Sequence, residues 1–237
     1  MTPMSSPGSP PRTHARCRST AMAIALVCAA SLTSAATLHC PCGTASVQAP
    51  EPALAELACT AVSDIASKLA RCGVVPGQPL HIRISTELGP NCMGLYHCDT
   101  GVIDVLSPEA IARARRPDGA FRTLPPEIYF ASIIAHEMSH AAYEAVACPF
   151  EDCPVTSDYI AYSMQMHTLP DPHRQTLIRD IDISHPVGRD HFSLVNLLMN
   201  PDGFARDAFA HFSQRPDGCA YVAQLMAADL VLDSERP

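Results

Sequence analysis

The chain has 237 residues, of which 47% are hydrophobic and 17% are charged, a composition typical of globular proteins. That length is enough for one well-packed domain. The formal net charge of −8 argues against nucleic acid or an anionic lipid surface as a partner, because both would repel an acidic protein.

The first 36 residues have the pattern of a secretory signal peptide. Three arginines precede an apolar run at 21–32 that is too short to span a membrane, and small residues at 33–36 offer a cleavage point. An uncleaved N-terminal anchor is the alternative. We expect residues 1–36 to be removed, which leaves an exported, periplasmic or extracellular, single domain at 37–237 with a net charge of −11. No second apolar run is long enough to cross a bilayer, so we expect no lasting membrane insertion after signal cleavage. We also expect a monomer.

Nine cysteines remain after such a cleavage, a density that predicts disulfides in an exported protein. Spacing alone does not fix their connectivity, and the odd number leaves at least one free thiol or an intermolecular bond. The alternative, a structural zinc site of four cysteines, is disfavoured because the chain has no C-x-x-C pair. The pairs favoured by closeness in sequence are Cys59–Cys72, Cys92–Cys98 and Cys148–Cys153.

The first part of the mature chain predicts an irregular arm followed by a helix and a strand. Residues 37–50 show no periodic pattern, whereas apolar residues recur at helical spacing from Pro52 onward. Gly73 is well placed to end that helix. Residues 80–85, LHIRIS, alternate apolar and polar side chains and predict a strand.

A hairpin is predicted next. Residues 92–98 and 102–107 flank the turn sequence Asp-Thr-Gly at 99–101. Ser107 and Pro108 then have the pattern of an N-cap and first residue of a short helix.

Helices dominate the rest of the predicted structure. Pro125 and Pro126 suit the first turn of a long helix, and a proline-rich loop at 148–154 separates it from a second helix at 155–169. The remaining pattern is also helical. We therefore expect an α+β fold with a small antiparallel or mixed sheet and a mostly helical C-terminal part.

The long helix carries the sequence IIAHEMSHAAYEAV at 133–146, which contains the pattern H-E-x-x-H. His136 and His140 are one helical turn apart, so both imidazoles can reach one zinc ion. Glu137 can lean over the ion without binding it and accept a proton from a water at the fourth position. An ordinary helix with exposed or hydrogen-bonded histidines is the alternative.

This segment resembles the zincin superfamily of zinc metallopeptidases. The resemblance runs from VIDVLS at 102–107 to the helix after the motif, about a third of the chain. It implies peptide-bond hydrolysis with bound Zn²⁺, a peptide or protein substrate, and an edge strand above the site helix, for which VIDVLS is the candidate. The metzincin branch is disfavoured because the third histidine of its longer motif is missing.

The third zinc ligand must come from elsewhere in the chain. In the gluzincin branch it is a glutamate on the following helix, and in the aspzincin branch it is an aspartate. Asp158, in TSDYIAY at 156–162, resembles the first in spacing and the second in ligand type, although Tyr162 comes one residue later than in the aspzincin pattern. An ordinary role for Asp158 near a helix start is the alternative. Glu144 is a weaker rival, because one more helical turn carries it about 5.4 Å past the metal.

Several other side chains are candidates for supporting roles. We expect Tyr162 to stabilise the oxyanion, with Tyr143, His185 and His191 as alternatives. Asp180 and Asp182 could accept a hydrogen bond from a ligand imidazole. Glu151 and Asp152 are remote candidates for the metal. The other histidines are expected to be surface or hydrogen-bonded core groups: His81, His97, His167 and His211.

The sequence thus predicts a zinc peptidase with His136, His140 and Asp158 as ligands, Glu137 as general base and Tyr162 as a catalytic donor. The alternative is a secreted, disulfide-linked domain without catalysis that keeps zinc as a structural or regulatory element, or an interaction module without metal.

Overall fold

The computed structural model describes residues 36–90, 92–181 and 183–234, which belong to the compact unit Thr33–Pro237. The predicted signal peptide lies outside the described residues except for Ala36, and so does Asp182. None of the helices in the described ranges has the length and hydropathy of a membrane span.

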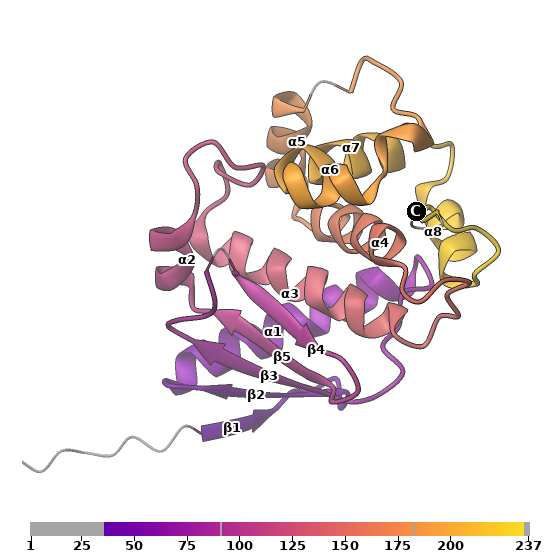
Figure 1. Cartoon of the computed structure of the whole chain (residues 1–237). Helices are drawn as coiled ribbons and strands as arrows, with labels where there is room; N and C mark the ends of the chain where they lie inside the picture. The colour runs from indigo at the N-terminus through magenta and orange to yellow at the C-terminus, as the bar shows by residue number, and fades with distance from the viewer. Residues whose placement is uncertain (1–35, 91, 182, 235–237) are drawn as a thin grey trace, which may run out of the picture. The chain divides into compact units, whose positions relative to one another are not determined.

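The described chain has an α+β fold with a five-stranded sheet and eight α-helices (Figure 1), so the predicted α+β class is confirmed. The strands are β1 (Ala36–His39), β2 (Ala45–Ala49), β3 (Leu80–Ser85), β4 (Gly94–His97) and β5 (Val102–Leu106). The helices are α1 (Pro52–Ala70), α2 (Pro108–Ala114), α3 (Pro126–Tyr143), α4 (Pro154–His167), α5 (Asp171–Asp180), α6 (Leu194–Met199), α7 (Pro201–Ser213) and α8 (Gly218–Met226), with a 3-10 turn, η1, at Arg189–His191.

The sheet is mixed, with the strand order β1-β2-β3-β5-β4. The central strand β3 is parallel to both β2 and β5, whereas β1 and β4 pair antiparallel to their neighbours. The prediction that VIDVLS forms the edge strand is wrong. This segment forms β5, which is an inner strand because β4 pairs beside it and occupies the edge. The hairpin itself is confirmed, although β4 is shorter than the predicted segment.

The segment predicted as an irregular arm is also corrected, because residues 37–50 form most of the β1–β2 hairpin. Val47 is fully buried in the core. Gly43 has a φ of +71° and permits the tight turn between the strands. A two-stranded hairpin of this length is marginal alone, so its stability comes from pairing with β3, which the local sequence does not reveal.

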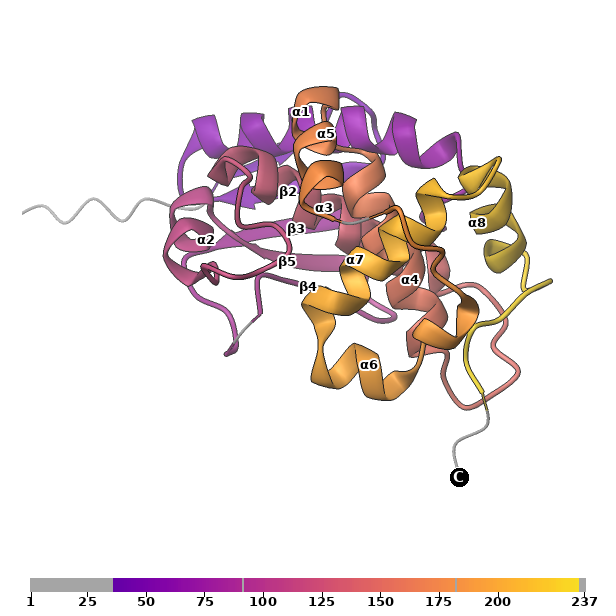
Figure 2. The ribbon, with the colours of Figure 1, turned by 90° about the horizontal axis from the view of Figure 1, so that it is seen from above.

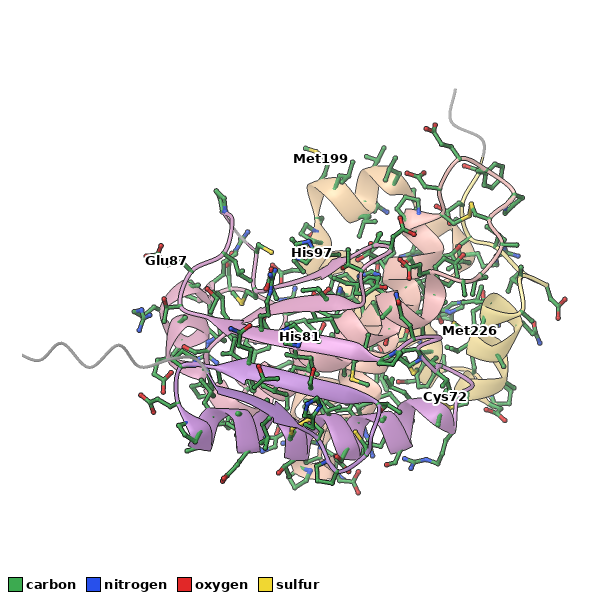
Figure 3. The ribbon with its side chains drawn as sticks, turned by 90° about the horizontal axis from the view of Figure 1, so that it is seen from below. Cys72, His81, Glu87, His97, Met199 and Met226 are labelled. Atoms are coloured by element: carbon green, nitrogen blue, oxygen red, sulfur yellow. A yellow bond between two sulfur atoms is a disulfide. The ribbon has the colours of Figure 1, made fainter. Side chains whose placement is uncertain are left out.

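Helices α1 and α3 cover one face of the sheet and contact each other. Leu80, Ile82 and Ile84 of β3 point to that covered face and are buried. The opposite face is polar and carries His81 and His97, both labelled in Figure 3. This division gives α3 one side against the sheet and another side free to meet the C-terminal helices.

The C-terminal helices form a second layer on α3. Helix α4 packs extensively against α3 and also contacts α6, α7 and α8 (Figure 2). Prolines occupy the first positions of α3 and α4, where a missing N–H costs nothing. The predicted cap of α2 is confirmed, since the Ser107 hydroxyl accepts from the Ala110 N–H. The packing of α4 on α3 is what brings the C-terminal half to the H-E-x-x-H helix.

Three disulfides join the described cysteines: Cys40–Cys59, Cys72–Cys219 and Cys148–Cys153. Of the three pairs predicted from closeness in sequence, only Cys148–Cys153 is confirmed. The predicted pair Cys59–Cys72 is wrong, because Cys59 lies within helix α1 and Cys72 follows its end, so the helix holds the two cysteines apart and each bonds a cysteine of a different segment. The pair Cys92–Cys98 is also wrong, since the extended strand β4 holds these cysteines apart, and both are free thiols together with Cys42.

We expect the disulfides to contribute differently to the free energy of unfolding, because they close loops of very different length. Cys72 and Cys219 are 147 residues apart, whereas Cys148 and Cys153 are five apart. Replacing Cys72 and Cys219 by alanine should lower the free energy of unfolding by roughly 3 kcal/mol more than replacing the short-range pair, through loop entropy. Denaturant unfolding of both double variants measures the difference, and equal losses would contradict it.

Candidate metal site

The two histidines of the H-E-x-x-H motif face each other on α3. Their positions four residues apart place both rings on one side of the helix. His136 Nε2 lies 3.0 Å from His140 Nε2, and the ring centroids are 4.7 Å apart. The motif therefore presents two imidazole nitrogens to one point.

Helix α4 brings Asp158 to the same point. Asp158 Oδ1 lies 3.9 Å from Nε2 of His136 and 3.9 Å from Nε2 of His140. These three residues form one of the two groupings of potential metal ligands among the described residues. The structure thus brings together the three residues that the sequence predicts as ligands, although a loop closed by a disulfide lies between His140 and Asp158.

The spacing of the three atoms can be compared with the size of a zinc site. A triangle with sides of 3.0, 3.9 and 3.9 Å has a circumradius of about 2.1 Å, equal to the usual zinc–nitrogen distance of about 2.0–2.1 Å. The exposed fractions of the side chains are 13% for His136, 22% for His140 and 23% for Asp158. The donor set fits one zinc ion, and all three side chains are partly exposed to solvent.

Burial sets the protonation of these groups in the metal-free protein. It lowers the pKa of His140 to about 4, and burial together with repulsion from His140 lowers the pKa of His136 well below its usual value. Both rings are therefore neutral at pH 7 and can offer a lone pair. Burial, with the nearby charge of Asp233, raises the pKa of Asp158 to about 7, so a bound cation would favour its charged form.

The second ring nitrogens of the two imidazoles differ in their surroundings. His140 Nδ1 lies 2.8 Å from the hydroxyl of Ser157. His136 Nδ1 is buried without a hydrogen-bond partner in the described ranges, although Gln165 lies close enough to raise the pKa of its ring. Gln165 in turn donates to Ser132 on α3. Sequence reasoning missed Ser157 and Gln165, although both share a helix with Asp158.

The two aspartates predicted to accept a hydrogen bond from an imidazole are not seen in that role. Asp180 pairs with Arg122 instead, because α5 lies away from the two imidazoles. Asp182 is not among the described residues. The Ser157 hydroxyl of α4 contacts His140 instead, because this helix already packs along α3.

Glu137 is held by the edge strand β4. It is 6% exposed, and its Oε2 accepts a hydrogen bond of 2.9 Å from the Tyr96 N–H. Burial and the charge of Asp158 raise the pKa of Glu137 to about 8, although the Tyr96 N–H acts in the opposite direction. A Cβ at Gly94 would lie 2.6 Å from Glu137 Oε1, so glycine permits the close approach of the strand.

Glu144 is hydrogen-bonded to the same strand and to the turn after it, and it is not part of the ligand cluster. Its Oε2 accepts a 2.7 Å hydrogen bond from the Tyr96 hydroxyl, and its Oε1 accepts from the Asp99 N–H at 2.5 Å. The structure places this rival ligand at the β4–β5 turn, two helical turns beyond Glu137. Tyr96 therefore connects two glutamates of α3, through its backbone and its side chain.

Tyr162 lies beside the cluster, whereas the alternative oxyanion donors do not join it. The Tyr162 ring centroid is 4.6 Å from that of His136, and burial raises the pKa of its hydroxyl. Tyr143 is buried in α3, and its pKa is raised by burial and by Asp233. His191 pairs with Asp207 instead. The ligand cluster also lacks His185, Glu151 and Asp152.

The remaining histidines are mostly hydrogen-bonded as expected. His81 contacts Ser46, His97 pairs with Asp104, and His211 contacts the Tyr159 hydroxyl. His167 is different, because it lies with Cys72 and Cys219 in the second potential ligand grouping. Those cysteines form a disulfide, and a disulfide sulfur is not the thiolate that binds a metal.

The raised pKa of Glu137 predicts how the metal-free protein responds to pH. Its stabilising contribution is full below the unfolded pKa of about 4.5 and is lost as pH rises through about 8. Relative to wild type, Glu137→Gln should therefore gain at least about 1.4 kcal/mol of unfolding free energy between pH 5 and pH 9 in a chelator. Exposed Glu127 on the same helix supplies the control variant, Glu127→Gln, and parallel profiles for both variants would contradict the account.

A family model places the chain among related sequences. It matches residues 45–235 and describes a family of unknown function, DUF6639. No curated protein matches the chain, and no solved structure matches it. Because the match covers most of the chain, the protein belongs to the DUF6639 family.

Proposed function

We propose that this protein is an exported zinc-dependent peptidase that hydrolyses peptide bonds with a metal-activated water. The observation that carries the proposal is the convergence of His136, His140 and Asp158 at zinc-binding distances, with Glu137 beside them. Two imidazoles, one carboxylate and an open position are typical of catalytic zinc rather than structural zinc. The three disulfides support export, because such bonds persist in oxidising compartments.

Zinc bound there would supply a Lewis acid that polarises a substrate carbonyl and lowers the pKa of a water. Glu137 is the residue that would move the proton. It accepts the proton of the attacking water and delivers it to the leaving amine. The Tyr96 N–H fixes one carboxylate oxygen at 2.9 Å, which orients the other oxygen for this transfer.

Two further elements would bind and stabilise the substrate. The hydroxyl of Tyr162 stays protonated because burial raises its pKa, so it can donate to the oxyanion that develops during attack. Strand β4 lies at the edge of the sheet and is hydrogen-bonded directly to Glu137. An extended peptide can add to such an edge by main-chain hydrogen bonds. This arrangement favours a peptide or protein as substrate.

Metal binding is tested by the zinc content of an Asp158 variant. Wild type should hold one equivalent of zinc after dialysis, and Asp158→Ala should bind zinc at least about 100-fold more weakly, because it loses a ligand. Asp207→Ala is the matched control, since Asp207 also pairs with a histidine but far along the chain from the cluster. Mass spectrometry of the metal content measures all three proteins, and equal zinc in wild type and Asp158→Ala would contradict the ligand assignment.

Catalysis is tested separately by Glu137→Gln. The variant should retain zinc but lose at least about 100-fold in turnover of a mixed peptide library, because the general base is gone. Zinc in wild type that stabilises the fold without any Glu137-dependent turnover would favour the alternative, a non-catalytic exported domain with a structural or regulatory zinc. Hydrolysis that persists in Glu137→Gln would contradict the assigned role.

A further inference from the structure

The C-terminal segment after α8 returns to the start of α4. We call Val231, Leu232 and Asp233 the strap. Its backbone is fixed at two points: Arg189 donates to the Val231 carbonyl at 2.7 Å, and the Leu232 N–H donates to the hydroxyl of Thr156 at 2.9 Å. The C-terminal segment can be followed in Figure 2, where it passes the loop that leads into α4.

Asp233 caps α4 from a distance of nearly eighty residues in the chain. Its carboxylate accepts from the N–H groups of Val155 and Thr156, each at 2.9 Å, and from the Thr156 hydroxyl at 2.6 Å. The local N-cap residue, Cys153, makes no side-chain cap. The first turn of α4 thus depends on a remote carboxylate for hydrogen bonds that a helix start normally obtains locally.

That first turn carries the groups that α4 contributes to the metal site. Ser157 supports His140, and Asp158 faces both imidazoles. They directly follow Thr156, which is fully buried and both donates to and accepts from the strap. A shift or fraying of the capped turn would therefore move the ligand oxygen and the partner of His140 together.

We propose that Asp233 is a positioning residue for the metal site, acting through the first turn of α4 rather than by touching the metal. The inference rests on the proposed function, because it assumes that Asp158 binds zinc. It adds that the C-terminal strap is part of the site, so that loss of the strap lowers metal affinity in a protein that still folds.

The experiment measures zinc affinity of the full chain by competition with a chromophoric chelator. Asp233→Ala should weaken zinc binding by roughly 10–100-fold, as expected for loss of a group that orients a ligand. Asp217→Ala is the matched control, because Asp217 caps α8 by the same kind of hydrogen bond, to the Ala220 N–H. Its zinc affinity should stay within about 2-fold of wild type, even if both variants lower Tm similarly.

A second pair of variants separates positioning from general stability. Thr156→Val keeps the buried shape but removes the hydroxyl that joins Asp233 and Leu232, and Thr156→Ser restores that hydroxyl. We expect weakened zinc binding for valine and near wild-type affinity for serine. Unchanged affinity in both Asp233→Ala and Thr156→Val would overturn the role of the strap while leaving the zinc site intact. Absence of zinc binding in wild type would overturn the proposed function and this inference with it.

Discussion

The packing of α4 on α3 is the contact on which the candidate site depends. Helix α3 alone offers two imidazoles and the carboxyl group of Glu137, but only two of the three candidate metal ligands. Only when α4 lies along it do Asp158, Ser157 and Gln165 meet His136 and His140. Because one helix–helix interface supplies both the candidate ligand Asp158 and the hydroxyl that contacts His140, disturbing it would affect the whole cluster at once.

The edge strand sets a second constraint, on the acid rather than on the metal. Tyr96 binds Glu137 through its N–H and Glu144 through its hydroxyl, so β4 is fixed at two points along α3. Gly94 allows this approach because any side chain there would strike Glu137. The sheet therefore does more than support α3: it orients the group proposed to move the proton and presents its free edge beside that group.

Much of this arrangement could be predicted from local patterns. The helix bearing His136 and His140, the strand at 80–85 and the ligand candidate Asp158 all follow from periodicity and motif spacing. What failed depends on distant contacts. The β1–β2 hairpin needs β3, and Cys72 finds its partner in α8 rather than nearby. The edge position passed from β5 to β4 because strand order is a property of the whole sheet. The strap at Asp233 could not be predicted from the sequence, since Asp233 caps a helix turn that is 77 residues away in the chain.

X-ray absorption at the zinc edge of the zinc-loaded protein would identify the atoms that bind zinc. For a site of two imidazoles and a carboxylate, we expect two imidazole nitrogens at about 2.0–2.1 Å, with oxygen completing the shell and no sulfur. Sulfur at about 2.3 Å would contradict this ligand set, because none of its three residues is a cysteine.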